Sequence, residues 1–439
     1  MELKPGYKQT EVGVIPEEWK SSTVRGLASS ARNAIVGGPF GSDLVSHDYV
    51  EHGVPVIRGQ NMSGQWVSGT FVFVTSAKAK SLEANLARPG DIVFTQRGTL
   101  GQVSLVPGKP FESYLVSQSQ MKLSVNREVA DPLFFFYVFT SEKQQELISG
   151  GTIQTGVPHI NLGILRDIPV QLPPLTEQRA IAGALSDVDE LIGALDQLIA
   201  KKLDLKQAAM QQLLTGQKRL PGFHGEWEVK RLGEIADVKT GPFGSSLHES
   251  DYVRDGTPII TVEHLGEFGV THFNLPLVSD SDRHRLRAYS LEIGDIVFSR
   301  VGSVDRNALI SPGEEGWLFS GRLLRVRTDR KKAFAPFLSY QFHGEAFKGL
   351  VRNVAVGQTM ACLNTQILKG IAVVLPSLPE QTAIAEVLSD MDAELAALEQ
   401  RRDKTRALKQ GMMQELLTGK TRLVDSGKLR VESGERRTS

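Results

Sequence analysis

The chain has little of what often reveals a protein's class. Among 439 residues there is one cysteine, Cys362, which excludes an internal disulfide and a cysteine-based zinc site and suggests a reducing compartment. The 50 Lys and Arg residues balance 50 Asp and Glu residues, which excludes a uniformly basic nucleic-acid coat. No run approaches the ~20 apolar residues of a membrane span, and the polar N-terminus lacks a signal-like core. We therefore expect a soluble, cytoplasmic protein of two or three domains that has no membrane partner.

Sequence motifs for catalysis are also missing. No phosphate-binding G-x-x-x-x-G-K-[ST] loop is present, because Gln414 stands where Gly419-Lys420-Thr421 would need its upstream glycine. The chain contains neither H-E-x-x-H nor G-x-S-x-G, and its histidines have no metal-ligand spacing. The sequence therefore predicts a binding protein with no catalytic site, no metal and no cofactor of its own.

What the sequence does contain is a long internal repeat. Gly38-Pro39-Phe40-Gly41-Ser42 recurs 203 positions later as Gly241-Pro242-Phe243-Gly244-Ser245. The segments Gly90–Phe94 and Leu213–Gly216 return as Gly294–Phe298 and Leu416–Gly419. A period of this length is too long for a solenoid unit, so each copy is domain-sized. The Gly-Pro-Phe-Gly-Ser segments are interpreted as turns that let the backbone approach another group closely.

Each copy consists of a globular part and a helical part. The globular parts contain short apolar runs that predict strands, such as 71–75 and 91–95, and a few helices, such as 132–149. Glu177 and Glu380 suit the first turn of a long helix, and Gly216 and Gly419 suit its C-terminal cap. We expect an α+β protein with a pseudo-twofold repeat. Its predicted parts are a globular domain at 1–175, a long helix at 176–216, a second globular domain at 217–375, a second long helix at 376–419, and a frayed polar tail at 420–439.

Apolar residues in the two long helices follow a heptad pattern, which is narrower than the stripe of an ordinary core-facing helix. This spacing predicts a helix-on-helix seam, and equivalent positions in a duplicated chain predict an antiparallel coiled coil. Two amphipathic helices, each packed on its own domain, remain the alternative. The seam residues are Ile181, Leu185, Val188, Ile192, Leu195 and Ile199 in the first helix, and Ile384, Leu388, Met391, Leu395 and Leu398 in the second.

Polar residues beside the repeated strands differ between the copies, as expected of two readers of different short targets. Arg and Lys can address guanine edges, Asn and Gln adenine edges, and Glu a cytosine amine. Any one of these residues could instead be a surface charge or a phosphate contact. The candidate DNA-binding residues are Arg58, Gln60, Asn61, Lys78, Lys80, Gln96 and Arg97 in the first copy, and Glu263, His264, Arg283, Arg285 and Arg300 in the second.

Together these motifs resemble the specificity subunit of type I restriction–modification enzymes over Tyr7 to Leu423. The resemblance is carried by the opening segment Gly13–Trp19, the two Gly-Asp-Ile-Val-Phe strands, and the helix entries Leu172–Gln178 and Leu375–Gln381. It implies two target recognition domains, each of which reads half of a split, asymmetric sequence in double-stranded DNA. It further implies helices that set the gap and dock two modification (methyltransferase) subunits, which restriction subunits then join. S-adenosylmethionine, ATP and Mg²⁺ would belong to those partner subunits.

Two other classes remain open from the residues alone. One is a duplicated coiled-coil scaffold that binds protein partners without reading DNA. The other is an enzyme whose site has no recognisable motif. The neutral charge of each half predicts weak DNA binding by this chain in the absence of its partners.

Overall fold

The computed structural model of the chain describes residues 5–151, 158–242, 247–266, 269–355, 361–424 and 428–430. The chain forms two compact units. Unit 1 comprises Met1–Ala194 and Arg401–Ser439, and unit 2 comprises Leu195–Gln400. Each unit therefore contains one globular part and a portion of both long helices. Most of the predicted tail lies outside the described residues, apart from the short pair β24 (Arg422–Val424) and β25 (Lys428–Arg430).

Unit 1 is built on two small sheets and short helices. One sheet has the order β10-β9-β12-β4, and the other has the order β5-β7-β6-β11-β8, in which only β6 and β11 pair in parallel. Two further pairs are β1–β2 and β3–β13. The strands are β1 (Tyr7–Thr10), β2 (Gly13–Pro16), β3 (Lys20–Thr23), β4 (Ile35–Gly37), β5 (Tyr49–Val50), β6 (Val54–Ile57), β7 (Val72–Val74), β8 (Leu86–Ala87), β9 (Ile92–Thr95), β10 (Val103–Leu105), β11 (Tyr114–Val116), β12 (Gln120–Leu123) and β13 (Pro169–Leu172). The short helices are α1 (Val24–Leu27), α2 (Ser76–Ser81), α3 (Pro132–Thr140), α4 (Glu142–Gly150) and α5 (Leu162–Asp167).

Unit 2 repeats most of this plan, although β1, β2 and β8 have no counterpart among its described strands. Its sheets have the orders β15-β22-β19-β20 and β16-β18-β17-β21, and β14 pairs with β23. The strands are β14 (Glu228–Arg231), β15 (Ala236–Thr240), β16 (Tyr252–Val253), β17 (Thr257–Ile260), β18 (Leu277–Val278), β19 (Ile296–Ser299), β20 (Asn307–Leu309), β21 (Leu318–Phe319), β22 (Leu323–Thr328) and β23 (Ala372–Leu375). The helices are α7 (Leu232–Ile235), α8 (Asp280–Arg285), α9 (Ala335–His343), α10 (Glu345–Val354) and α11 (Thr365–Gly370).

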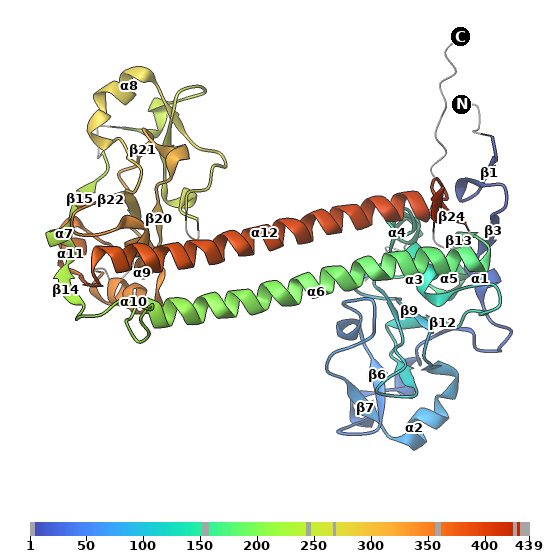
Figure 1. The fold of residues 1–439 in the computed structure, drawn as a ribbon. Coiled ribbons are helices and arrows are strands. Elements are labelled where there is room, and N and C mark those ends of the chain that lie inside the picture. Colours follow the sequence, from blue (N-terminus) through green and yellow to red (C-terminus); the bar gives the residue numbers. More distant parts are fainter. Residues whose placement is uncertain are drawn as a thin grey trace, which may run out of the picture. The chain divides into compact units, whose positions relative to one another are not determined.

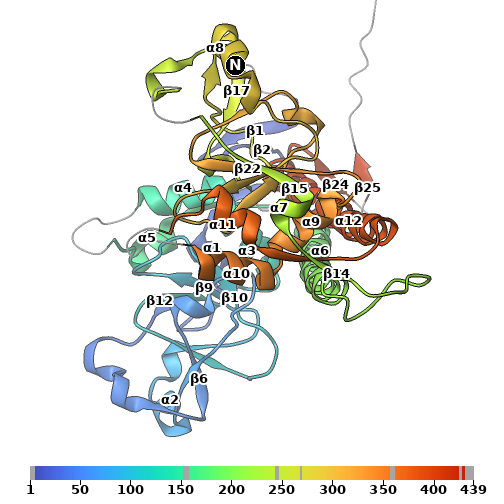
Figure 2. The same cartoon turned by 90° about the vertical axis from the view of Figure 1, so that its left-hand side faces the viewer.

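The repeated Gly-Asp-Ile-Val-Phe segments form the central strands β9 and β19, as predicted, and all four residues of each strand are buried. The aspartate before each strand holds the preceding turn: Asp91 accepts a hydrogen bond from the Arg88 amide, and Asp295 accepts one from the Glu292 amide. In Figure 1, β9 and β12 lie between α3 and the part of unit 1 that carries β6, β7 and α2. Figure 2 shows the same order in unit 2, from α8 and β17 through β22 to α9. Strands buried on both faces explain the continuous apolar runs in the sequence.

The helix predicted over 132–149 is in fact two helices, α3 and α4. Ser141, which stands between them, has an extended backbone, and its hydroxyl donates to the Val138 carbonyl. Gly344 separates α9 from α10 at the equivalent place. A side chain or glycine that favours a turn thus ends the first helix in both copies.

The long helices α6 (Leu175–Leu213) and α12 (Leu378–Leu416) have 39 residues each. Glu177 and Glu380 lie in their first turns, as predicted. Beyond their last turns, Gly216 and Gly419 have φ values of +71° and +72°, the left-handed conformation that favours glycine at a helix C-terminus. Both helix ends were therefore predictable to within a few residues.

Within each unit the start of one long helix lies beside the end of the other. In unit 1, Ile181 and Leu185 share a core with Leu416 and Leu417. In unit 2, Leu213 shares a core with Ile384 and Leu388. All eleven predicted seam residues are buried or half-buried.

Ionic clusters join the same helix portions. In unit 1, Asp189 on α6 accepts a hydrogen bond from Tyr137 on α3 at 2.8 Å and pairs with Lys409 on α12 at 2.7 Å. In unit 2, Asp392 on α12 accepts from Tyr340 on α9 at 2.6 Å and pairs with Lys206 on α6. Burial is the main cause that raises the pKa of both tyrosines. Lys202, which interrupts the heptad pattern, pairs with Glu394 at 2.6 Å.

A second ionic cluster closes unit 1. Glu177, which is only 4% exposed, accepts hydrogen bonds from Trp19 at 3.0 Å and from Arg422, which follows α12. These bonds to Glu177 are the main cause that raises the pKa of the Arg422 guanidinium. In unit 2 the equivalent buried Glu380 pairs with Arg219. Residues near both ends of the chain thus pack together in unit 1.

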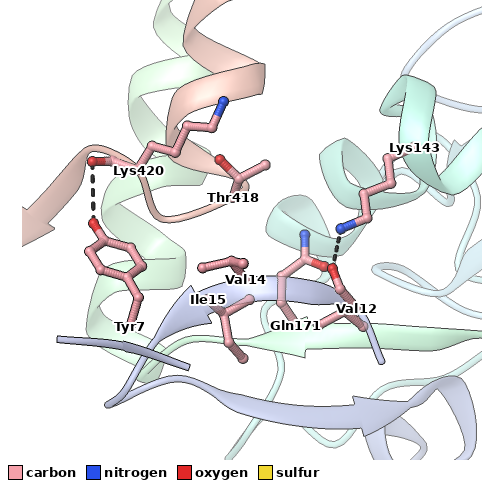
Figure 3. A pocket seen from close by; sticks show the side chains of 8 residues that line it. All are labelled: Tyr7, Val12, Val14, Ile15, Lys143, Gln171, Thr418 and Lys420. Atoms are coloured by element: carbon pink, nitrogen blue, oxygen red, sulfur yellow. Dashed lines mark hydrogen bonds between the residues drawn. The ribbon is translucent and has the colours of Figure 1, made fainter. Parts of the chain in front are cut away.

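A cavity of about 410 Å³ lies next to this closure in unit 1 (Figure 3). Its polar groups include Lys143, which donates to the Val12 carbonyl, and Tyr7, which donates to the backbone carbonyls of Gly419 and Lys420. Desolvation lowers the pKa of Lys143. The lining residues are Tyr7, Val12, Val14, Ile15, Lys143, Gln171, Thr418 and Lys420.

No helix in the described parts of the chain is long and apolar enough to span a membrane.

Candidate nucleic-acid interface

Several strand ends of unit 1 meet at one polar surface. The Gln96 amide donates to the Ser119 carbonyl at 2.7 Å, which joins the end of β9 to the turn before β12. The Gly38 amide donates to the Gln120 carbonyl at 2.9 Å, and the Ser117 amide to the Ile57 carbonyl at 3.1 Å. We call the surface formed by residues 38–41, 58–60, 96–97 and 117–120 the polar edge of unit 1.

The polar edge of unit 2, residues 241–242, 261–263, 300–301 and 320–323, has the same backbone frame. The Arg300 amide donates to the Arg322 carbonyl at 2.9 Å, and the Gly241 amide to the Leu323 carbonyl at 3.1 Å. The Ser320 amide donates to the Ile260 carbonyl at 2.9 Å. Each bond is the counterpart, one repeat later, of a bond in unit 1. The two edges therefore present their side chains from equivalent positions.

Six of the twelve candidate DNA-binding residues lie on these edges. Arg58, Gln60, Gln96 and Arg97 lie on the edge of unit 1, and Glu263 and Arg300 lie on that of unit 2. Gln60, Arg97 and Glu263 are exposed, whereas Arg58, Gln96 and Arg300 are half-buried. The buried Nε of Arg58 has no hydrogen-bond partner among the described residues, which is uncommon for a buried donor.

Two candidate side chains are buried just behind the edges, where they make hydrogen bonds to the backbone. Asn61 is 1% exposed; it accepts from the Arg58 amide at 3.1 Å and donates to two backbone carbonyls. His264, its counterpart, is 2% exposed, and its Nδ1 accepts from the Thr261 amide at 3.1 Å. Both side chains cap the turn that follows β6 or β17. Because neither can reach a base without breaking that turn, we leave them out of the candidate interface.

The other four candidates lie on the short helices α2 and α8. Lys78 pairs with Asp48 at 3.0 Å, and Arg285 pairs with Asp282 at 2.7 Å within its own helix. Hydrogen bonding to Arg285 is the largest cause that lowers the pKa of Asp282. Lys80 and Arg283 are exposed. These four basic residues form a set separate from the strand-end frame, and their chemistry suits phosphate contact.

The structure adds residues that the sequence interpretation missed. Gln118 and Ser119 stand on the edge of unit 1 where unit 2 has Gly321 and Arg322, and both Gln118 and Arg322 are exposed. The sequence feature that indicates them is a turn, 117–120 in unit 1 and 320–323 in unit 2, whose residues differ between the copies although the neighbouring buried strands match. Their place on the edges follows from the pairing of β12 with β9 and of β22 with β19.

The chemistry of the edges is that of hydrogen-bond recognition. Unit 1 offers two arginines, several glutamines and serines, and no acid among residues 58–60, 96–97 and 117–120. Unit 2 offers Arg300, Arg322 and Glu263. Such guanidinium, amide and carboxylate groups match the donors and acceptors of base edges. In the described residues, no group of three or more His, Cys, Asp and Glu side chains is arranged to hold a metal ion.

Comparison with known proteins gives a consistent result. The family described as "type I restriction modification DNA specificity domain" matches twice, over residues 16–203 and 224–406. The chain is 25% identical to the putative type I restriction enzyme MjaX specificity subunit of Methanocaldococcus jannaschii, over 95% of this chain and 97% of that protein. It is 26% identical to the MjaVIII specificity subunit of the same organism, over 70% of this chain and 75% of that one.

The fold is also shared with a solved structure. The S subunit of a type I restriction–modification system from M. genitalium superposes with a TM-score of 0.58 and 17% identity, covering 95% of this chain and 98% of that one. The family match covers most of the chain, in two copies that coincide with the internal repeat. The chain therefore belongs to the type I restriction–modification DNA specificity family and is a specificity subunit, the part of such a system that recognises DNA sequence.

Proposed function

We propose that each unit reads one half of a bipartite, asymmetric DNA site through its polar edge. One observation carries the proposal: the two edges have the same backbone hydrogen bonds and different side chains. Gln96 stands where unit 2 has Arg300, and Ser119 stands where it has Arg322. The same backbone with different side chains favours two domains that recognise different DNA sequences.

Dividing the site between two units has a physical advantage. Each matched base pair contributes about 1–3 kcal/mol of discrimination, so one small edge selects poorly among genomic competitors. Connecting two such edges makes the second contact intramolecular, which raises affinity without any new contact. The basic residues of α2 and α8 would add sequence-independent contacts to phosphate.

We further propose that α6 and α12 form an antiparallel coiled coil that sets the gap between the half-sites and docks two modification subunits. The ion pairs Lys202–Glu394 and Lys409–Asp189 support the antiparallel order. Leucines on the long helices that do not face the seam support docking, because apolar side chains in water favour a partner surface. They are Leu191, Leu198, Leu203, Leu205 and Leu408, each 39–60% exposed.

In this proposal the chain has no catalytic role of its own. Methyl transfer, with its S-adenosylmethionine, belongs to the modification subunits, and ATP- and Mg²⁺-dependent cleavage belongs to the restriction subunits that join the complex. The complex would act on cytoplasmic DNA. The neutral charge of the chain fits this division of labour, because the partner subunits would supply much of the grip on the duplex.

The experiment is a domain exchange in the assembled modification complex. Residues 221–375 are replaced with the matching segment of a relative of different specificity, and methylated bases are mapped across a genome. One half of the motif is expected to change and the other to stay. A change in both halves would overturn the assignment of one unit to one half-site. A complex that assembles but binds no DNA would favour the alternative, a scaffold for protein partners.

A further inference from the structure

The Gly-Pro-Phe-Gly-Ser sequence begins at the same place on both polar edges, directly after β4 and β15. Its first glycine approaches the neighbouring turn too closely for any side chain. A Cβ on Gly38 would lie 1.8 Å from the Ser117 carbonyl oxygen, and one on Gly241 would lie 2.1 Å from that of Ser320. Only glycine fits there, so the start of the turn is fixed in the same way in both units.

The remainder of the turn is also held in unit 1. The Asp43 amide donates to the Phe40 carbonyl at 3.0 Å, and the side chain of Gln118 donates to the Gly41 carbonyl at 2.9 Å. Despite these restraints, the side chain of Phe40 is 76% exposed. Phe243, its counterpart in sequence, lies outside the described residues. The fold therefore fixes the backbone around an aromatic ring that it does not bury.

The repetition of this turn distinguishes it from the residues around it. Side chains that read bases should differ between units that read different half-sites, as Gln96 and Arg300 do. A side chain that is the same in both units suits a contact that every half-site offers. The turn from Gly38 to Leu44 contains one acid, Asp43, and no basic residue, so it is unsuited to phosphate. Its exposed aromatic ring suits an apolar contact with the base stack.

We propose that Phe40 is an aromatic wedge that inserts at a base step beside the half-site of unit 1. Apolar side chains that enter a base step unstack it and widen the contact, without reading its sequence. The amide and arginine side chains around the turn would hold the duplex against the ring. This inference rests on the proposed function, because it requires DNA on the polar edge.

The test uses the full complex with its modification subunits and the variant Phe40→Ala. Duplexes carry 2-aminopurine, whose fluorescence rises on unstacking, at successive steps beside the half-site. We expect the variant to bind cognate and unrelated duplexes about tenfold more weakly, since base–aromatic contacts have that order of effect. We also expect it to lose the fluorescence rise while keeping the methylated motif. Phe40→Trp should retain both properties.

Phe273→Ala is the matched control, because Phe273 is equally exposed, at 77%, and lies outside the repeated turn. Wild-type affinity and fluorescence in Phe40→Ala would overturn the inference, and so would a change at one motif position, which would make Phe40 a base reader. A lower melting temperature, or loss of the modification subunits during purification, would also overturn it in favour of a structural or protein contact. The proposed function fails separately, if the wild-type complex has no sequence-specific binding.

Discussion

Inserting one heptad into each long helix, between the portions that belong to the two units, is expected to lengthen the gap of the recognised site. The insertion points follow Ala194 in α6 and Gln400 in α12, where the units divide. Both ionic clusters and both apolar cores then keep their partners, because each lies wholly within one unit. Seven residues also preserve the heptad seam.

The magnitude follows from helix geometry. Seven residues at about 1.5 Å each add about 10 Å, which corresponds to about 3 base pairs at 3.4 Å per step. Because 3 base pairs rotate the second half-site by about 100°, methylation should also be slower. Three inserted heptads add about 31 Å, close to a full turn of duplex, and should recover part of the rate.

The assay is genome-wide mapping of methylated bases in cells that express each variant with its modification partner. The expected result is two unchanged half-sites separated by a gap about 3 base pairs longer. A heptad inserted in α6 alone is the control, because the unmatched segment can only bulge. Unchanged spacing in the double insertion would refute the idea that the helices set the gap.

Three further predictions concern the buried polar groups. Arg422→Ala leaves Glu177 buried with Trp19 as its hydrogen-bond partner and should destabilise unit 1 by about 3 kcal/mol in denaturant unfolding, the lower end for a broken buried pair because Arg422 is partly exposed. The double variant Glu177→Gln with Arg422→Met should recover part of this loss. Full stability of Arg422→Ala would contradict the role of the pair. Asn61→Ala should lower the melting temperature and leave the methylated motif unchanged, because the Asn61 side chain caps a turn. A change at one base of the motif would instead show that Asn61 contacts that base. Burial lowers the pKa of His343, beside which Lys206 and Lys348 lie, so the unfolded chain binds the proton at a higher pH than the folded chain, and stability present above pH ~6.5 is lost as the pH falls. Melting curves from pH 7.5 to 5 should show this loss of stability in the wild type and a smaller loss in His343→Thr. Equal losses in the two proteins would refute the role of His343.

Much of the frame was predictable because the chain contains it twice. Helix ends at Gly216 and Gly419 and the buried strands β9 and β19 follow from local rules of capping and periodicity. The ionic clusters were not predictable. In the sequence, Lys202 and Arg402 appear only as breaks in the apolar pattern, and the partner of Lys202, Glu394, lies 192 residues away.

The candidate interface was predictable in part. Residues directly after the repeated strands, such as Gln96 and Arg300, do lie on the edges. Asn61 and His264 also follow strands but cap a turn, and sequence spacing does not distinguish a capping side chain from an exposed one. Gln118 and Arg322 were missed because their position depends on which strands are neighbours, including the parallel pairs β6–β11 and β17–β21.

The central claim is that two similar units read two different half-sites. Mapping the methylated bases in cells that carry this chain and its modification subunits tests it most directly. The account predicts a bipartite motif, with two different short halves separated by a gap of fixed length. A continuous motif, or methylation without any shared sequence in a competent complex, would contradict it.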